Sequence, residues 1–317
     1  MLQPATLTSD EIAQAQREID PVFLATPQVD WPGLDRALGC SLTLKIETLN
    51  PIRSFKGRGA SLLVRRHGAR GPLVSASAGN WGQGLAYACG RSKVPLTIFA
   101  SVGANRLKVA RMRELGATVH LHGDDFDAAK AEAEAFAAAA SLRFVADGRD
   151  REAALGAGTI AAELTSAAPF DAVLVPLGNG ALLTGMGTWI KQRHPTTRVV
   201  GVHALGADAM AASWRAGRPI VRACVDTIAD GIAVRVPEPY ALKDMVGVVD
   251  DVVGVDDEAI VSAMRLLLEH AGQLAEPAGA AGVAALVAHP ERWRGARVAV
   301  PLCGNNLTME QIAAWLS

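Results

Sequence analysis

The sequence predicts an α/β protein built on mostly parallel sheets, and three observations support this prediction. Short apolar runs alternate with Ala-rich, helix-prone stretches along most of the chain, which is the pattern of repeated strand–helix–strand units. Several of the predicted strands are apolar throughout, as expected of strands whose two faces are both covered by helices. The loops richest in glycine and small polar residues follow predicted strands, and open α/β sheets bind their ligands at that edge.

The strands and helices are predicted in order from these runs. Strands are expected at residues 42–47, 73–77, 96–100, 118–122, 172–176, 199–204 and 298–302. Helices are expected between them, at residues 82–91, 106–115, 125–142, 153–166 and 257–271. The segment 124–140 is rich in alanine, but its charged residues are spaced as on the solvated face of a helix. We therefore interpret it as an ordinary helix.

Composition limits the class of protein. The chain has 317 residues, half of them apolar, which is enough for about two domains. Its 31 basic and 32 acidic residues give a net charge of −1, so nothing indicates a nucleic-acid partner. No apolar run is long enough to span a membrane, and the N-terminal stretch does not resemble a secretory signal. The cysteines lie far apart, with no CxxC pair, which favours a reducing cytoplasm over a disulfide framework: Cys40, Cys89, Cys224 and Cys303.

A lysine between an aromatic residue and two glycines is the first candidate for chemistry. Residues 54–60 read SFKGRGA. A lysine that reacts with a carbonyl group must be poorly solvated, because the neutral amine is the nucleophile. Phe55 precedes Lys56, and the glycines after it leave room for a planar ring close to the backbone. In isolation, the same run is also compatible with a surface lysine at the start of a helix.

Two small-residue turns follow predicted strands. Residues 75–84 read SASAGNWGQG, and residues 176–185 read PLGNGALLTG. Free N–H groups at the start of a helix bind anions, so the first turn is a candidate for binding a carboxylate and the second for binding a phosphate. Taken singly, each turn is equally compatible with a tight connection, and the second with a dinucleotide-binding loop.

Two segments near the end of the chain are further candidates for a functional site. Residues 276–281 read EPAGAA, and residues 301–306 read PLCGNN at the end of a predicted strand. A lone cysteine is usually a small buried apolar residue, so Cys303 gains interest only from its position beside the other motifs.

These elements, in this order, resemble the fold-type II pyridoxal 5'-phosphate (PLP) enzymes, and most closely the serine/threonine dehydratases, which are ammonia-lyases. The resemblance covers the chain from Thr26, in a typical TP pair, to about Asn306. It implies a two-domain, tryptophan synthase β-like fold in which each domain is a mostly parallel sheet flanked by helices. A large PLP-binding domain would comprise residues 1–45 plus 147–317, and a small domain of residues 46–146 would close on the substrate.

The resemblance also implies roles for particular residues. SFKGR resembles the Schiff-base motif, so Lys56 is expected to be the catalytic lysine and Phe55 to contact the cofactor. The turn at 75–84 resembles the substrate loop SAGNHxQG, with Trp81 in place of the histidine, and Asn80 is expected to contact the cofactor as well. The glycine-rich turn replaces a run of four glycines, and Cys303 takes the place of a serine that faces the pyridine nitrogen. The expected substrate-binding residues are Ser77, Ala78, Gly79, Asn80 and Trp81, and the further cofactor-binding residues are Gly178, Asn179, Gly180, Ala181, Leu182, Glu276 and Cys303.

Elimination of water from a β-hydroxy amino acid, such as L-threonine or L-serine, is the reaction that we expect. A thiol opposite the pyridine nitrogen would not keep that nitrogen protonated. Ala78 replaces the serine that supplies the second base in serine racemase. The EPAGAA segment and the DGIA segment at residues 230–233 are closer to dehydratases than to sulfhydrylases. The amino acid would displace Lys56, which would remove the α-proton, and the hydroxyl would leave with a proton from the cofactor phosphate. The products would be a 2-oxo acid and ammonia.

Other functions stay open at this point. A threonine synthase-like or other PLP β/γ-replacement enzyme on an activated amino acid is compatible with the GNG turn. A phosphorylated substrate would need basic side chains, for which Arg53, Arg58 and Arg106 are the nearest in sequence. A catalytically dead PLP-binding protein is disfavoured by the intact Lys56 and Asn80.

The remaining expectations concern metals and assembly. No metal site is expected, because His203 and Ala209 stand where many relatives have acidic ligands, and His120 and His122 are explained as solvated or core histidines. A homodimer is expected, with no regulatory domain after residue 306.

Overall fold

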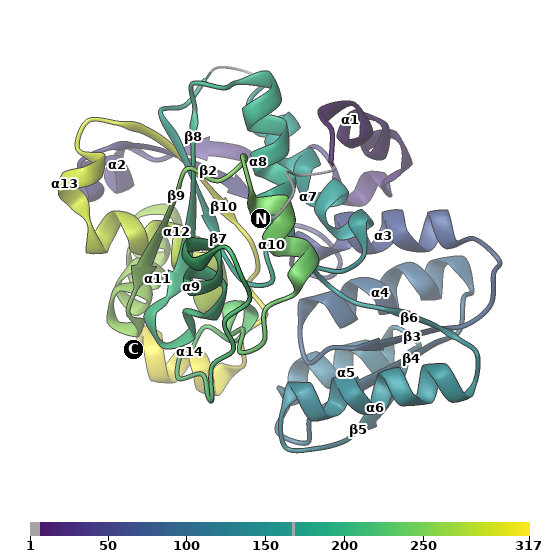
Figure 1. The fold of residues 1–317 in the computed structure, drawn as a ribbon. Helices are drawn as coiled ribbons and strands as arrows, with labels where there is room; N and C mark the ends of the chain where they lie inside the picture. The colour runs from purple at the N-terminus through teal and green to yellow at the C-terminus, as the bar shows by residue number, and fades with distance from the viewer. Residues whose placement is uncertain (1–6, 167–168) are drawn as a thin grey trace.

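The fold contains two sheets that lie in separate lobes of the molecule (Figure 1). The structure is a computed structural model, and it describes residues 7–166 and 169–317. The six-stranded sheet has the order β1 (Gln28–Asp30), β2 (Ser41–Ile46), β10 (Arg297–Leu302), β7 (Ala172–Pro176), β8 (Arg198–Ala204) and β9 (Asp251–Val255). Strand β1 is antiparallel to β2, and the other neighbours in this sheet are parallel.

The four-stranded sheet is parallel throughout. Its order is β5 (Thr118–Leu121), β4 (Leu96–Ala100), β3 (Leu73–Ala76) and β6 (Arg143–Val145). One face packs on α6 (Phe126–Ala139), where Ala129, Ala133 and Ala137 contact the sheet side chains Val74 and Phe99. The other face is covered by α3 (Lys56–His67), α4 (Asn80–Ser92) and α5 (Arg106–Glu114).

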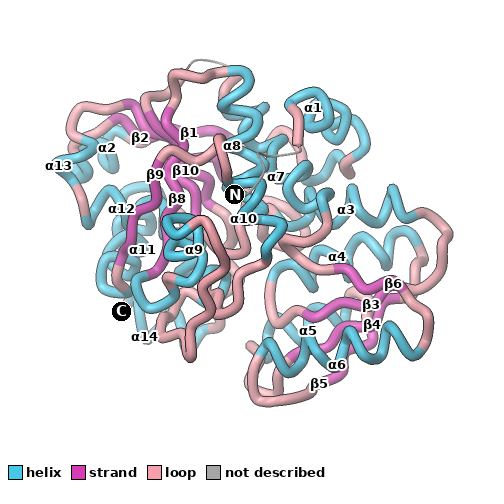
Figure 2. Tube along the Cα trace, in the orientation of Figure 1, coloured by secondary structure: helices cyan, strands magenta, loops and turns pink. Residues whose placement is uncertain are grey.

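Helices cover both faces of the six-stranded sheet as well. On one face, α11 (Asp257–Ala271) and α12 (Pro277–Ala288) pack on Leu42, Leu174 and Val200. On the other, α7 (Arg151–Leu164), α8 (Ala181–Arg193) and α10 (Pro239–Met245) pack on Val173 and Val175. This two-sided burial explains the continuous apolar run of β7 and the apolar residues that follow Arg297 in β10. The other helices, α1 (Ser9–Glu18), α2 (Pro32–Leu38), α9 (Ala209–Ala216), α13 (Pro290–Trp293) and α14 (Met309–Leu316), lie at the periphery of the two lobes (Figure 2).

The predicted α/β class with parallel, helix-flanked sheets is confirmed. Every predicted strand is present, with ends within one residue of the expected ones. Strands β1, β6 and β9 were not predicted, because two of them have three residues and the third begins with an aspartate. The four-stranded sheet falls inside the range 46–146, while the division into a large domain and a closing small domain stays a prediction.

A buried ionic cluster joins β2, α3 and α7 close to Lys56. Arg58, whose side chain is fully buried, donates to Glu47 at 2.8 Å and to Glu163 at 2.7 Å. Lys45 pairs with Glu163 at 2.6 Å and donates to the carbonyl of Thr26. Removing one charged side chain from such a cluster strongly destabilises the fold, because it leaves a buried charge without its partner. It therefore fixes the start of α3, where Lys56 lies, against the six-stranded sheet.

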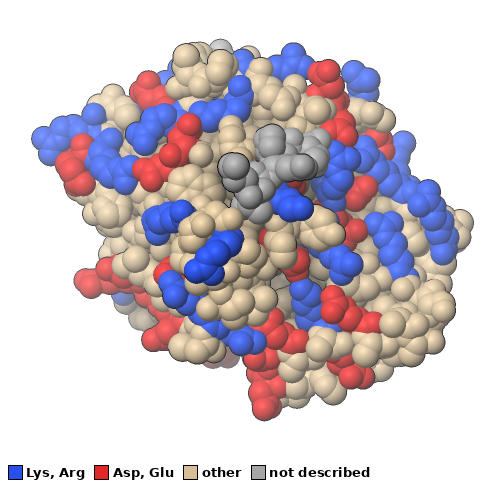
Figure 3. Space-filling model, viewed as in Figure 1, with Lys and Arg blue, Asp and Glu red and all other residues tan. Residues whose placement is uncertain are grey.

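Basic and acidic side chains are interspersed over the molecular face in Figure 3.

None of the helices that the structure describes combines the length and the apolar character that a membrane crossing requires.

Candidate active site

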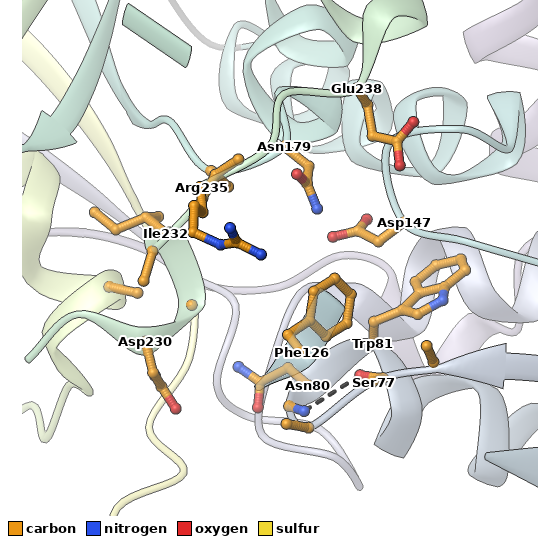
Figure 4. Close-up of a pocket in the computed structure, with 18 of the residues that line it drawn as sticks. Ser77, Asn80, Trp81, Phe126, Asp147, Asn179, Asp230, Ile232, Arg235 and Glu238 are labelled. Carbon is orange, nitrogen blue, oxygen red and sulfur yellow. Dashed lines mark hydrogen bonds between the residues drawn. The ribbon is translucent and has the colours of Figure 1, made fainter. Parts of the chain in front are cut away.

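A cavity of about 520 Å³ lies between the two sheets. The segments that follow β3, β6, β7 and β10 line it, so it lies at the carboxyl edges of strands from both sheets. In Figure 4, Ser77, Asn80 and Trp81 approach the cavity from one side, and Asn179 and Arg235 approach it from the other. All the site residues that the sequence predicted line this single cavity, although their roles stay predictions.

Lys56 is the first residue of α3, and its side chain enters the cavity. The N–H of Phe55 donates to the carbonyl of Cys303 at 3.1 Å, which ties the start of the helix to the end of β10. The Nζ of Lys56 lies 4.7 Å from the centroid of the Phe55 ring and 2.5 Å from Oδ2 of Asp147. The side chains of Lys56 and Asp147 are 17% and 19% exposed. The amine is thus accessible to a small molecule but largely shielded from bulk water.

The turn after β3 leads into α4 and is fixed by its own side chains. The hydroxyl of Ser77 accepts hydrogen bonds from the N–H groups of Gly79 and Gly82 at 3.2 and 2.9 Å. Helix α4 begins at Asn80, so the N–H groups of Asn80 and Trp81 have no acceptor within the helix. Trp81 is buried, and its indole N–H has no hydrogen-bond partner. The turn therefore presents donors to the cavity, as a carboxylate-binding loop requires.

The glycine-rich turn after β7 leads into α8, which starts at Ala181. A Cβ at Gly178 would lie 3.0 Å from the carbonyl oxygen of Gly231, and Gly180 has a φ of +95°. The left-handed backbone at Gly180 therefore favours glycine, and a side chain at Gly178 would need the segment around Gly231 to shift. The residues at the start of α8 line the cavity, where the helix dipole and the free N–H groups of a first turn favour an anion.

Glu276 is buried at the centre of a hydrogen-bonded cluster on the cavity wall. Its Oε1 accepts from the side-chain amide of Asn80 at 2.5 Å, and its Oε2 accepts from the N–H of Asn306 at 3.1 Å. Burial raises the pKa of Glu276, and the ammonium of Lys108, 3.7 Å away, opposes that rise. This cluster holds Asn80 in place from the six-stranded sheet.

Cys303 lies directly after β10, which is the parallel neighbour of β7 in the sheet, and it lines the same cavity as the turn that follows β7. Burial raises the pKa of its thiol well above 9.0, so the thiol is neutral near pH 7. Its Sγ donates to the carbonyl of Pro301 at 3.2 Å. The predicted role of Cys303, to face a pyridine nitrogen, stays a prediction.

Several charged residues of the cavity wall were not predicted. Lys108, on α5, is buried and pairs with Asp230 at 2.7 Å. Arg235 pairs with Asp127, and Lys130 pairs with Glu238. Each pair joins a segment of the four-stranded lobe to the segment 230–238. The sequence offered little signal for them, because their partners are about a hundred residues away along the chain.

Residues that the sequence left as alternatives lie elsewhere. Arg53, Arg58 and Arg106 do not line the cavity, and Arg58 is fully engaged in the buried ionic cluster. His203 is buried and bonded to the carbonyl of Ala204, while Asp208 pairs with Arg222. His120 stacks on Phe99 at 5.2 Å, and His122 is 3.9 Å from Glu132. Within residues 7–166 and 169–317, no group of three potential metal ligands is present.

The residues of the cavity fit a phosphorylated pyridine aldehyde. The glycine positions 178 and 180 leave a hollow that a Cβ would fill, at the start of a helix that favours an anion. A neutral thiol and a shielded lysine amine line the same cavity. Lys56 would hold the aldehyde carbon, residues 178–182 the phosphate, and Cys303 the ring nitrogen.

Comparison with known proteins agrees with this geometry. Residues 19–304 match the family model described as pyridoxal-phosphate dependent enzyme. The L-threonine ammonia-lyase of Thermotoga maritima is 35% identical over 311 residues, which cover 96% of this chain and 77% of that protein. The structure of maize serine racemase superposes with a TM-score of 0.90 at 26% identity, covering 97% of this chain and 96% of that one. Threonine deaminase isoform 2 from Solanum lycopersicum gives a TM-score of 0.88 at 28% identity, covering 98% and 89%.

Proposed function

The chain belongs to the family of pyridoxal-phosphate dependent enzymes, and we propose from this that it is a lyase acting on a β-hydroxy amino acid such as L-threonine or L-serine. It eliminates water across the α,β bond and leaves a 2-oxo acid and ammonia. The observation that carries the proposal is the position of the Lys56 amine, between the glycine-rich turn that starts α8 and the donor-rich turn that starts α4.

The chain's residues divide the binding of cofactor and substrate between the two lobes. Pyridoxal phosphate, when bound, withdraws electrons from the carbon that bears the amino group and makes its hydrogen acidic. Residues 178–182, Phe55, Glu276 and Cys303 would hold it from the six-stranded side and the start of α3. The turn of residues 77–81 would bind the substrate carboxylate with its backbone N–H groups, so the α-hydrogen would face Lys56.

Lys56 is the general base of the proposed reaction. Its amine lies in the cavity, shielded from bulk water, and is the nucleophile and base that the reaction needs. Ala78 lines the same cavity and carries no titratable group, so no second base is available at that position for racemisation. A phosphorylated substrate of a replacement enzyme would require free cations, and Arg53, Arg58 and Arg106 do not line the cavity. Elimination is therefore favoured.

The test is the visible spectrum of the purified protein with pyridoxal phosphate, followed by titration with L-threonine and L-serine. We expect an absorbance band of the lysine-bound cofactor, a change of that band on addition of amino acid, and formation of 2-oxo acid and ammonia in equal amounts. K56A should abolish the band and the product. A wild-type protein that binds the cofactor yet forms no 2-oxo acid from either amino acid would contradict the proposed reaction.

We also propose a cytoplasmic location and a homodimer. The cysteines of the described chain are all free, which suits a reducing compartment. Light scattering on the purified protein, with the mass of two chains expected, tests the assembly.

A further inference from the structure

Asp147 holds the reactive amine of the cavity by direct contact. Its Oδ2 accepts from the Nζ of Lys56 at 2.5 Å, and its Oδ1 is buried without a hydrogen-bond partner. A buried carboxylate oxygen without a donor is unfavourable, so this side chain lowers the stability of the fold. A catalytic role is one of the explanations for a buried polar atom without a hydrogen-bond partner.

The backbone fixes Asp147 in this position. The residue lies in the turn between β6 and α7, where the N–H of Ala146 donates to Oδ2 of Asp150 at 2.8 Å. Gly148 follows with a φ of +83°, and a Cβ there would lie 2.9 Å from the Cβ of Asn179. The turn thus packs directly on the proposed phosphate-binding residues. The carboxylate is held by the fold and is not a mobile surface group.

The other carboxylates of the cavity wall are neutralised by cations of their own. Asp230 and Glu276 lie beside Lys108, Asp127 and Asp125 pair with Arg235, and Glu238 pairs with Lys130. In the described parts of the chain, the only ion pair of Asp147 is with Lys56. Once the lysine amine is used for the cofactor and the substrate, Asp147 is the carboxylate of the wall that is free to accept or give a proton.

We propose that Asp147 is a second acid–base residue of this active site, which relays the proton from Lys56 to the leaving hydroxyl. The proposal rests on the proposed function. The Cα–H bond breaks and its proton goes to Nζ of Lys56. The electron pair forms the second bond between Cα and Cβ as the Cβ–O bond breaks. The proton passes from Nζ to Asp147 Oδ2, and Asp147 gives it to the departing oxygen, so that water leaves and Lys56 is neutral again.

The geometry makes this route short. The β-oxygen of the substrate is two bonds from Cα, whose hydrogen must lie at Lys56 for removal. A carboxylate that touches the same Nζ is therefore close to the leaving group as well. The route differs from the one expected from the sequence, in which the cofactor phosphate supplies the proton. Only the route proposed here needs Asp147, so a change at this residue distinguishes the two routes.

Exchange of the α-hydrogen separates the role of Asp147 from that of Lys56. In D₂O, Asp147→Asn should lower 2-oxo acid formation by about 100-fold, the usual scale of a lost acid–base group, while the substrate still exchanges its α-hydrogen. Asp147→Glu, which keeps a carboxylate, should recover part of the elimination. Asp124→Asn, an exposed carboxylate outside the cavity, is the matched control. Elimination at the wild-type rate in Asp147→Asn, or a parallel loss of exchange and elimination, would overturn the proposal.

A second measurement uses the protein without cofactor. In the wild type the Nζ of Lys56 is engaged by Oδ2 of Asp147, so an amine-acylating reagent should label Lys56 slowly. Asp147→Asn should accelerate that labelling by about tenfold, as read by peptide mass spectrometry, and Asp124→Asn should not. Unchanged labelling of Lys56 in Asp147→Asn would refute the pairing in solution. The labelling measurement depends neither on cofactor binding by the variant nor on activity of the wild type towards hydroxy amino acids.

Discussion

At the scale of single residues, burial separates the four thiols of this chain. Cys40, Cys89 and Cys303 are buried, and Cys224 is exposed at the edge of the cavity. Burial raises the pKa of Cys40 to about 11 and that of Cys89 to about 12, and it raises the pKa of Cys303 well above 9.0. Since the thiolate is the reactive form, these three thiols should be inert in the native protein.

Alkylation with iodoacetamide tests this expectation. At pH 8, Cys224 should react first because it is exposed, and the three buried thiols should react more slowly, by about tenfold or more, because burial limits access to them and raises their pKa. Peptide mass spectrometry gives the rate at each site, and Cys224→Ser should remove the fast phase. All four thiols should react alike in denaturant. Labelling of Cys303 at the rate of Cys224 would mean that the thiol is not buried as described.

At the scale of elements, the start of α8 depends on a turn that leaves little room for a side chain at Gly178. Gly178→Ala would place a methyl group 3.0 Å from the carbonyl oxygen of Gly231 and 3.3 Å from Cα of Ile232, so that one of the two segments must move. We expect cofactor affinity, measured by absorbance titration, to fall by about tenfold or more, which corresponds to about 1.4 kcal/mol. Gly103→Ala, where a Cβ meets no atom within 4 Å, is the control. Equal cofactor affinities in the two variants would show that the turn can move without weakening cofactor binding.

The cluster that joins β2, α3 and α7 should make stability depend on acid pH. Hydrogen bonds and charge from Arg58 and Lys45 outweigh burial and lower the pKa of Glu163 from 4.5 to about 2. A depressed pKa means that the unfolded chain binds this proton more tightly, so the stabilisation is complete above pH 4.5 and is lost as the pH falls towards 2. The shift corresponds to about 3 kcal/mol.

Glu163→Gln should therefore lower the free energy of unfolding at pH 7 by about 3 kcal/mol and by much less at pH 2.5, where the wild type has lost most of that contribution. Urea unfolding of the cofactor-free protein at both pH values measures this difference. Glu269→Gln, at an exposed position of α11, should change neither value appreciably. An equal loss at the two pH values would contradict the assigned pKa.

The elements also show what sequence alone could predict. The strands β7 and β10 carry continuous apolar runs, and their ends follow from the pattern to within one residue. Lys56, Ser77 and Gly178 lie in motifs of adjacent residues, so that local sequence was enough. Asp147 and Lys108 lie in no such motif. Their importance depends on partners that the two lobes bring together, 91 residues apart for Asp147 and Lys56 and 122 for Lys108 and Asp230.

At the scale of the whole molecule, the two lobes share a cavity wall with an excess of negative charge. Six carboxylates and four cations line it, and one of the cations is Lys56, which the cofactor would occupy. The six are Asp125, Asp127, Asp147, Asp230, Glu238 and Glu276, and the four are Lys56, Lys108, Lys130 and Arg235. A second carboxylate on the substrate would meet unfavourable charge on this wall.

The cavity should therefore discriminate against 3-hydroxyaspartate, a β-hydroxy amino acid that carries a second carboxylate. We expect kcat/KM for 3-hydroxyaspartate to be about tenfold or more below that for 3-hydroxyasparagine, which has nearly the same shape without the charge. Production of 2-oxo acid from both compounds, measured at low salt, gives the ratio, and added salt should narrow it. A preference for the charged compound would show that a cation of the wall is free to bind it.

The position of β10 bears on how the protein is made. This strand lies between β2 and β7, so that Val298 pairs with Leu42 although the ribosome adds Val298 long after Leu42. The strands β3 to β6 pair among themselves and can assemble while translation continues, but the larger sheet stays split until β10 has left the ribosome. Cys303 directly follows that strand, and its carbonyl anchors the residue before Lys56. A nascent or prematurely terminated chain therefore has the lysine without the site that makes it reactive.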